Sequence, residues 1–102
     1  MKRGDILSKD HDAICTESIL AEAYALVYGE RGEIYGHPRE NFQRTADLWR
    51  AVLGIEVTPA QVALCMVLVK VARLVETPDH RDGWVDLAGY AETGARCEGL
   101  DP

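Results

Sequence analysis

Apolar residues recur at helical spacing in four stretches of the chain, and residues that favour turns separate these stretches. The pattern predicts helices over residues 16–28, 38–53, 59–76 and 82–97. No segment alternates apolar and polar residues for long enough to predict a strand, and residues 54–57 are at most a short extended link. Helices joined by short connections are typical of an all-α fold, so we expect a compact, four-helix bundle-like single domain over residues 13–102.

Capping residues and proline define the expected helix boundaries. Thr16 is expected to cap the first helix, and Pro38 suits the first turn of the second because its missing N–H costs nothing there. Thr58 and Gln61 flank Pro59 at the spacing of a capping box. The start of the third helix is therefore the best-defined boundary in the chain.

Each predicted helix carries apolar residues that should point towards the core. The residues expected to face inward are Ile19, Leu20, Ala23, Leu26, Val27, Phe42, Ala46, Trp49, Leu53, Trp84, Leu87, Ala88 and Ala91. The third helix is apolar around most of its circumference, so the pattern leaves its inward direction open, and Cys65 is interpreted as a small core residue. Gly83 and Gly89 would allow a neighbouring helix or a ligand to approach the fourth helix closely.

The length and charge of the chain limit the class of protein. A length of 102 residues allows one modest core, and a net charge of -6 argues against a general nucleic-acid-binding protein, which needs a basic surface. The longest apolar run, about ten residues, is too short to span a bilayer, so no membrane association is expected. Residues 1–12 are interpreted as a flexible lead-in without the apolar segment of a signal peptide. Three cysteines without metal-ligand spacing fit a reducing, cytoplasmic compartment.

Two cations interrupt the apolar third helix. Lys70 and Arg73 are three residues apart, which places both on one face of the helix. Burying either charge without a partner would cost several kcal/mol, so both must meet anions or extend to the surface. One interpretation is a structural ion pair with Asp82 or Asp86 of the next helix. The other is a phosphate clamp, in which Arg73 binds with two N–H groups and Lys70 acts as a point charge.

The fourth helix places Asp82, Asp86 and Tyr90 on one stripe. Two carboxylates one turn apart are candidate ligands of Mg²⁺, the usual partner of a nucleoside triphosphate. The alternative is structural: Asp82 would interact with the positive end of the helix dipole, and Asp86 would pair with Lys70 or Arg73.

The loop before the second helix holds a third group of candidates. Glycines and a helix start offer free N–H groups to an anion. The side chains that could hold a phosphate or stack on a base are Tyr35, His37, Arg39 and Asn41, together with Tyr90 of the fourth helix. The spacing matches no known phosphate-binding fingerprint, and the alternative is a packed loop between two helices.

Three sequence runs carry a resemblance that covers residues 18–97. These runs, YGHPRENFQRTADLW, VTPAQVALCMVLVKVARL and HRDGWVDLAGYA, resemble a family of small phage and prophage proteins, frequent in phages of actinobacteria, whose domain has no assigned function. The resemblance implies a phage-encoded protein that acts in the cytoplasm of the bacterial host.

A looser resemblance is to the MazG-like, all-α nucleoside triphosphate pyrophosphohydrolases, which are usually oligomeric and bind Mg²⁺ through acidic residues on two helices. Asp86 in WVDLAGY looks like the aspartate of their ExxD element, but Gly83 stands where the glutamate is expected. This departure favours nucleotide binding over hydrolysis.

Three functions follow from these observations. The first choice is a nucleotide-binding protein that sequesters a host signal or metabolite, with a small anionic, nucleotide-like ligand and a homo-oligomeric assembly. The second is a MazG-like, Mg²⁺-dependent pyrophosphohydrolase. The third is a structural or protein-interaction module whose polar centre only fixes its packing.

Overall fold

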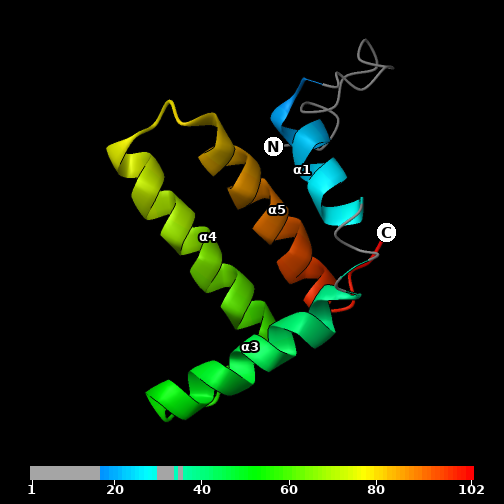
Figure 1. Ribbon diagram of the computed structural model, residues 1–102, viewed down its shortest axis with the longest axis vertical. Helices are drawn as coiled ribbons and strands as arrows, with labels where there is room; N and C mark the ends of the chain where they lie inside the picture. Colours follow the sequence, from blue (N-terminus) through cyan, green and yellow to red (C-terminus); the bar gives the residue numbers. More distant parts are fainter. Residues whose placement is uncertain (1–16, 30–33, 35) are drawn as a thin grey trace.

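The computed structural model describes residues 17–29, 34 and 36–102, which contain four long helices (Figure 1). They are α1 (Ile19–Tyr28), α3 (Pro38–Leu53), α4 (Pro59–Glu76) and α5 (Arg81–Cys97). These described residues contain no strand, so the predicted all-α single-domain fold is confirmed. The predicted lead-in, residues 1–12, lies outside the described part of the chain.

Local capping contacts fix the ends of the helices. Thr58 and Gln61 form the predicted capping box at the start of α4, with the Thr58 hydroxyl accepting from the Gln61 N–H at 3.2 Å. The predicted cap of the first helix at Thr16 is wrong. Ser18 caps α1, because its hydroxyl oxygen accepts a hydrogen bond from the Ala21 N–H at 3.0 Å.

The helices are arranged around α5 (Figure 1). α4 and α5 form an antiparallel pair joined by the short loop of residues 77–80, and α1 packs against α5 on its other side. α3 crosses the end of this layer and contacts both α4 and α5. None of the helices in the described ranges is both long and apolar enough to cross a membrane.

The main core lies where α3 crosses the α4–α5 pair. It consists of buried residues from all three helices, namely Phe42, Ala46, Val62, Ala63 and Cys97. Trp49 and Tyr90 are partly buried against this cluster. Among the described residues this core is small, and many apolar side chains of the helices are exposed.

Small residues bring α4 and α5 close together. A Cβ atom on Gly83 would lie 2.8 Å from Cδ2 of Leu74, and one on Gly94 would lie 3.0 Å from Cβ of Ala63. Both distances are shorter than ordinary contacts between carbon atoms. The expectation that Gly83 allows close helix packing is therefore confirmed.

Several predicted inward directions are wrong. Side chains that prove to be exposed are Leu20, Leu26, Leu53, Cys65, Trp84 and Ala91. Trp84 points to the surface because its indole N–H donates to the Pro78 carbonyl at 2.9 Å. α5 instead buries Gly83, Val85 and Cys97.

Candidate functional site

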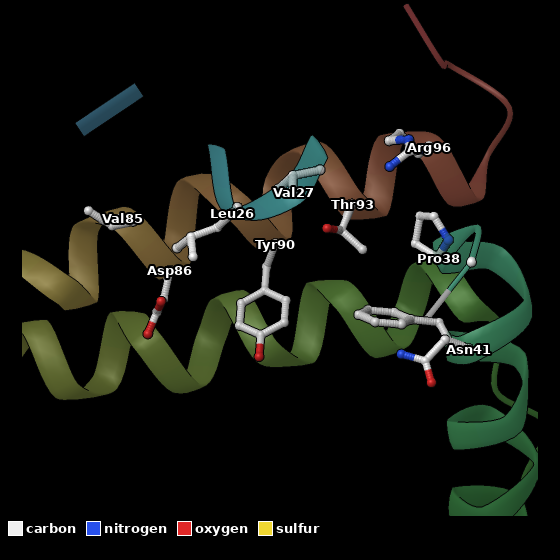
Figure 2. A pocket seen from close by; sticks show the side chains of 12 residues that line it. Leu26, Val27, Pro38, Asn41, Val85, Asp86, Tyr90, Thr93 and Arg96 are labelled. Atoms are coloured by element: carbon white, nitrogen blue, oxygen red, sulfur yellow. The ribbon is translucent and has the colours of Figure 1, made fainter. Parts of the chain in front are cut away.

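A pocket of about 260 Å³ opens between α1, α3 and α5 (Figure 2). Its lining mixes apolar, aromatic, polar and charged side chains: Leu26, Val27, Gly36, Pro38, Asn41, Phe42, Val85, Asp86, Gly89, Tyr90, Thr93 and Arg96. Figure 2 shows Asp86 and Tyr90 extending from α5 towards α4, whereas α1 contributes Leu26 and Val27. An apolar pocket with a few polar groups is the usual form of a small-molecule site.

Three predicted site residues lie in this pocket. Asn41 comes from the first turns of α3, and Asp86 and Tyr90 lie one turn apart on α5. The Tyr90 ring also packs near Phe42, with ring centroids 6.4 Å apart. Tyr35 lies outside the described residues, so its predicted stacking role stays a prediction.

The two cations of α4 are used differently. Lys70 forms an ion pair with Asp86, with Nζ 3.0 Å from Oδ2, and only 15% of the lysine side chain is exposed. The ion pair that the structural interpretation predicts for Lys70 is therefore present. Arg73, by contrast, is exposed. The structure thus does not bring Lys70 and Arg73 together around one buried anion, and their clamp stays a prediction.

The two predicted Mg²⁺ ligands also have different surroundings. Asp86 lines the pocket but is paired with Lys70, whereas Asp82 is exposed in the first turn of α5. Within the described ranges, no three His, Cys, Asp or Glu side chains gather closely enough to hold a metal ion. The acidic stripe therefore offers Mg²⁺ two carboxylates in unequal environments.

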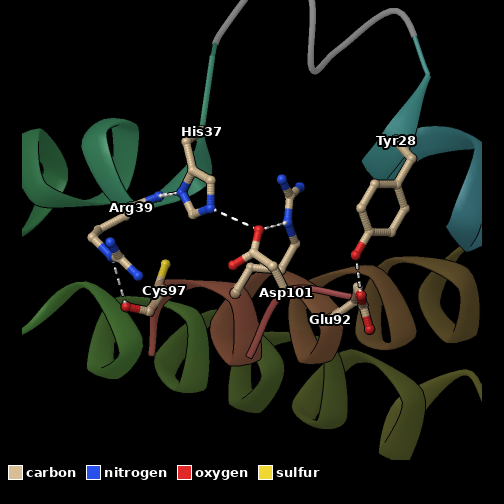
Figure 3. A network of polar contacts seen from close by, with 7 residues as sticks. Tyr28, His37, Arg39, Glu92, Cys97 and Asp101 are labelled. Atoms are coloured by element: carbon tan, nitrogen blue, oxygen red, sulfur yellow. Dashed lines mark hydrogen bonds and ion pairs between the residues drawn. The ribbon is translucent and has the colours of Figure 1, made fainter. Parts of the chain in front are cut away.

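The predicted loop residues His37 and Arg39 join a different group of contacts (Figure 3). We call this group the tail network; its members are His37, Arg39, Arg96, Cys97 and Asp101. His37 caps α3, since its Nδ1 accepts from the Arg39 N–H at 3.0 Å. The Arg39 side chain donates from Nε to the Cys97 carbonyl at 3.1 Å. These contacts make the loop a structural joint between α3 and the end of α5.

Asp101 is the centre of the tail network. Its Oδ2 lies 2.9 Å from Nε2 of His37 and accepts from Nε of Arg96 at 3.1 Å. Hydrogen bonds from His37 and Arg96 lower the pKa of the Asp101 carboxyl. Arg96 therefore lines the pocket while its side chain is held by the C-terminal tail.

Tyr28 links α1 to α5 beside the tail network. Its hydroxyl donates to the Glu92 carboxylate, and the guanidinium carbon of Arg96 lies 4.7 Å from the centre of its ring. Burial, followed by the hydrogen bond to Glu92, raises the pKa of Tyr28 to about 12. These contacts hold α1 over one side of the pocket.

Sequence reasoning missed several residues of the site. Thr93 and Arg96 line the pocket, and both continue the α5 stripe from Tyr90 at helical spacing. That spacing was a usable signal. Leu26 and Val27 were assigned to the core, and only the packing of α1 against α5 shows that they line the pocket.

These observations define a small all-α domain with a partly polar pocket between three helices. The chain belongs to the family described as "Domain of unknown function (DUF6378)", which covers residues 18–98. No solved structure matches the chain.

Two curated relatives come from phages. The chain is 50% identical over 76 residues to the "Gene 55 protein" of Mycobacterium phage D29, covering 74% of this chain and 50% of that protein. It is 47% identical over 75 residues to the "Gene 55 protein" of Mycobacterium phage L5, covering 72% of this chain and 48% of that protein. The chain therefore spans about half the length of these relatives. The predicted resemblance to phage proteins is confirmed, and none of these matches bears on the resemblance to pyrophosphohydrolases.

Proposed function

We propose that this phage-type protein binds a small nucleotide-like ligand in the pocket between α1, α3 and α5. The observation that carries the proposal is the pocket itself, because a single cavity of about 260 Å³ combines aromatic, amide, hydroxyl and guanidinium groups. This volume lies just below the usual range of ligand pockets, about 300–1,000 Å³, so it suits one base and sugar better than a whole dinucleotide.

The aromatic and amide groups favour a planar, hydrogen-bonding ligand. Tyr90 and Phe42 offer faces or edges of rings for a base to contact. The Asn41 amide carries both donors and an acceptor, so it can read the edge of a base. The Thr93 hydroxyl offers a further polar contact, for example to a sugar.

The cation that can meet a phosphate in this pocket is Arg96. It is the arginine among the lining residues, and the bond from its Nε to Asp101 orients the guanidinium. Arginine suits phosphate because its planar group presents several N–H donors. The proposal therefore moves the anion contact from the α4 cations to the last turn of α5.

Binding without cleavage is favoured over pyrophosphate release. The carboxylate of Asp86 already neutralises Lys70, and Asp82 is exposed outside the pocket lining. Metal-assisted hydrolysis would need both carboxylates to face one phosphate group. For a phage protein, capture of a host nucleotide signal or metabolite is a use that requires binding alone.

A thermal-shift screen tests the proposal. The purified chain would be heated with nucleoside mono-, di- and triphosphates, cyclic dinucleotides and ADP-ribose, with and without Mg²⁺, and every hit analysed for products by chromatography. A ligand at about 100 times its dissociation constant stabilises the folded state by roughly 2.7 kcal/mol, which shifts the melting temperature measurably.

Each outcome separates the three functions. A shift with the nucleotide recovered intact is the expected result. Product formation that requires Mg²⁺ would replace this proposal with the pyrophosphohydrolase. No shift with any nucleotide at millimolar concentration would overturn it and favour the structural or interaction module.

A further inference from the structure

The surface of α4 that α5 does not cover carries exposed apolar side chains that the pocket does not use. Four of its side chains are spaced four, three and four residues apart: Leu64, Leu68, Val71 and Val75. They are 61%, 65%, 40% and 79% exposed, respectively. We call these four residues the outer α4 face.

The outer α4 face has the pattern of a helix–helix seam. Its alternating spacing is that of the a and d positions of a coiled coil. Cys65 and Ala72 lie beside it, are exposed and are small, so they would not hinder a second helix from approaching. No helix in the described part of the chain covers this side of α4 (Figure 1).

The outer α4 face carries no charged side chain that would favour its contact with water. Lys70 and Arg73 are the charged residues between positions 60 and 75, and neither belongs to the seam. Lys70 points inward to Asp86, and Arg73 lies on the side of α4 opposite Val71 and Val75 by its helical position. A face without charges offers nothing for charge complementarity and fits an equally apolar surface.

We propose that the outer α4 face is the interface through which two copies of this chain associate. In a two-fold dimer both copies contribute the same surface, so the two outer α4 faces match in length, spacing and lack of charge. The exposed apolar surface along α4 is on the order of 500 Å² per copy, so a pair would bury about 1,000 Å². That total is the lower bound for a specific interface, which indicates a dimer that dissociates on dilution.

The α3 helix would add to this interface. Its C-terminal half extends past α4 in Figure 1 and carries exposed Leu48 and Val52. These two side chains give a partner a second apolar contact beside the outer α4 face. This interface is separate from the pocket and does not depend on the proposed ligand.

The oligomeric state of the full chain without nucleotide tests this inference. Sedimentation equilibrium over a dilution series should show the mass of two chains at high concentration and of one chain at low concentration. Leu68→Glu and Val75→Glu, at the middle and the end of the seam, should each weaken association at least about a hundredfold, because a carboxylate would be buried in apolar surface.

Leu100→Glu is the matched control, because Leu100 is 69% exposed on the C-terminal tail rather than on α4. It should leave the dissociation constant unchanged, and circular dichroism should show that all three variants keep their helices. A wild-type chain that stays monomeric at all concentrations would overturn the proposal. So would a dimer that survives both seam variants, or one that Leu100→Glu disrupts equally.

Discussion

Tyr28 is a single residue that makes two kinds of contact with α5. Its hydroxyl binds the Glu92 carboxylate, and its ring lies beneath the guanidinium of Arg96. Because its pKa is raised to about 12, the folded chain holds the phenol proton more tightly than the unfolded chain does. The stabilisation that follows from burial of Tyr28, and then from its bond to Glu92, is complete below about pH 10, the ordinary pKa of tyrosine, and disappears as the pH rises through the folded value.

Tyr28→Phe should therefore change the alkaline stability of the protein. At pH 7 we expect the free energy of unfolding to fall by about 1 kcal/mol, the usual worth of one hydrogen bond. Between pH 10 and 12 the variant should lose less of its melting temperature than the wild type. Thermal unfolding followed by circular dichroism measures both effects.

Tyr24→Phe is the control for this prediction. Tyr24 lies one turn earlier on α1, is 65% exposed, and keeps its ring contact with Tyr28 when only the hydroxyl is removed. Its alkaline melting profile should follow that of the wild type. Identical profiles for the two variants would show that the Tyr28–Glu92 bond does not contribute to the pH dependence.

At the level of helices, two glycines of α5 have opposite surroundings. A Cβ atom on Gly83 would lie 2.8 Å from Cδ2 of Leu74 in α4, whereas one on Gly89 would lie 3.7 Å from Cγ2 of Val27 in α1. The first distance is a clash and the second is an ordinary contact. The same substitution should therefore have opposite effects at the two positions.

Gly83→Ala is expected to destabilise the fold despite the better helix propensity of alanine. Overpacking costs about 1–3 kcal/mol, against roughly 1 kcal/mol recovered from the helix. Gly89→Ala should stabilise by up to about 1 kcal/mol. Urea unfolding compares the two variants with the wild type, and a Gly83→Ala protein more stable than the wild type would mean that Leu74 moves aside at little cost.

The helices could be predicted from the sequence because their ends depend on local chemistry. Pro38 and the capping box at Thr58 define the starts of α3 and α4 without help from the rest of the fold. Which side of each helix is buried, by contrast, depends on its contacts with other helices. Cys65 was assigned to the core and is exposed, because α4 is apolar on nearly every side and its contacts with α3 and α5 select the buried one.

The site was predictable to a similar extent. Asn41, Asp86 and Tyr90 were recognised as candidates from residue type and spacing, and all three line the pocket. His37 and Arg39 were recognised for the same reasons, but they bind the end of the chain instead. The difference arises from Asp101, whose approach to His37 joins residues 64 positions apart and has no local signal.

For the molecule as a whole, the pocket exists only when α1, α3 and α5 are assembled. A ligand held there would contact all three helices, so substitutions of lining residues on each helix should change its affinity. Asn41 is the best test on α3, because its amide lines the pocket and can be removed without altering the buried core residues Phe42 and Ala46.

Asn41→Ala should reduce the affinity for the nucleotide identified by thermal shift about tenfold, which corresponds to the loss of roughly one hydrogen bond. Isothermal titration calorimetry measures the dissociation constant directly. Gln43→Ala serves as the control, because Gln43 is exposed on the same helix and bonds to Asp47 at 3.0 Å. Equal affinities for the wild type and the Asn41 variant would place the ligand elsewhere.

The ion pair between Lys70 and Asp86 bears on how many structures this chain can adopt. Because α4 is apolar around most of its circumference, hydrophobicity alone only weakly opposes rotations about its long axis. Each of those rotations would take the Lys70 ammonium away from its carboxylate. The charged pair therefore contributes to conformational uniqueness, together with the close approach of Leu74 to Gly83 and of Ala63 to Gly94.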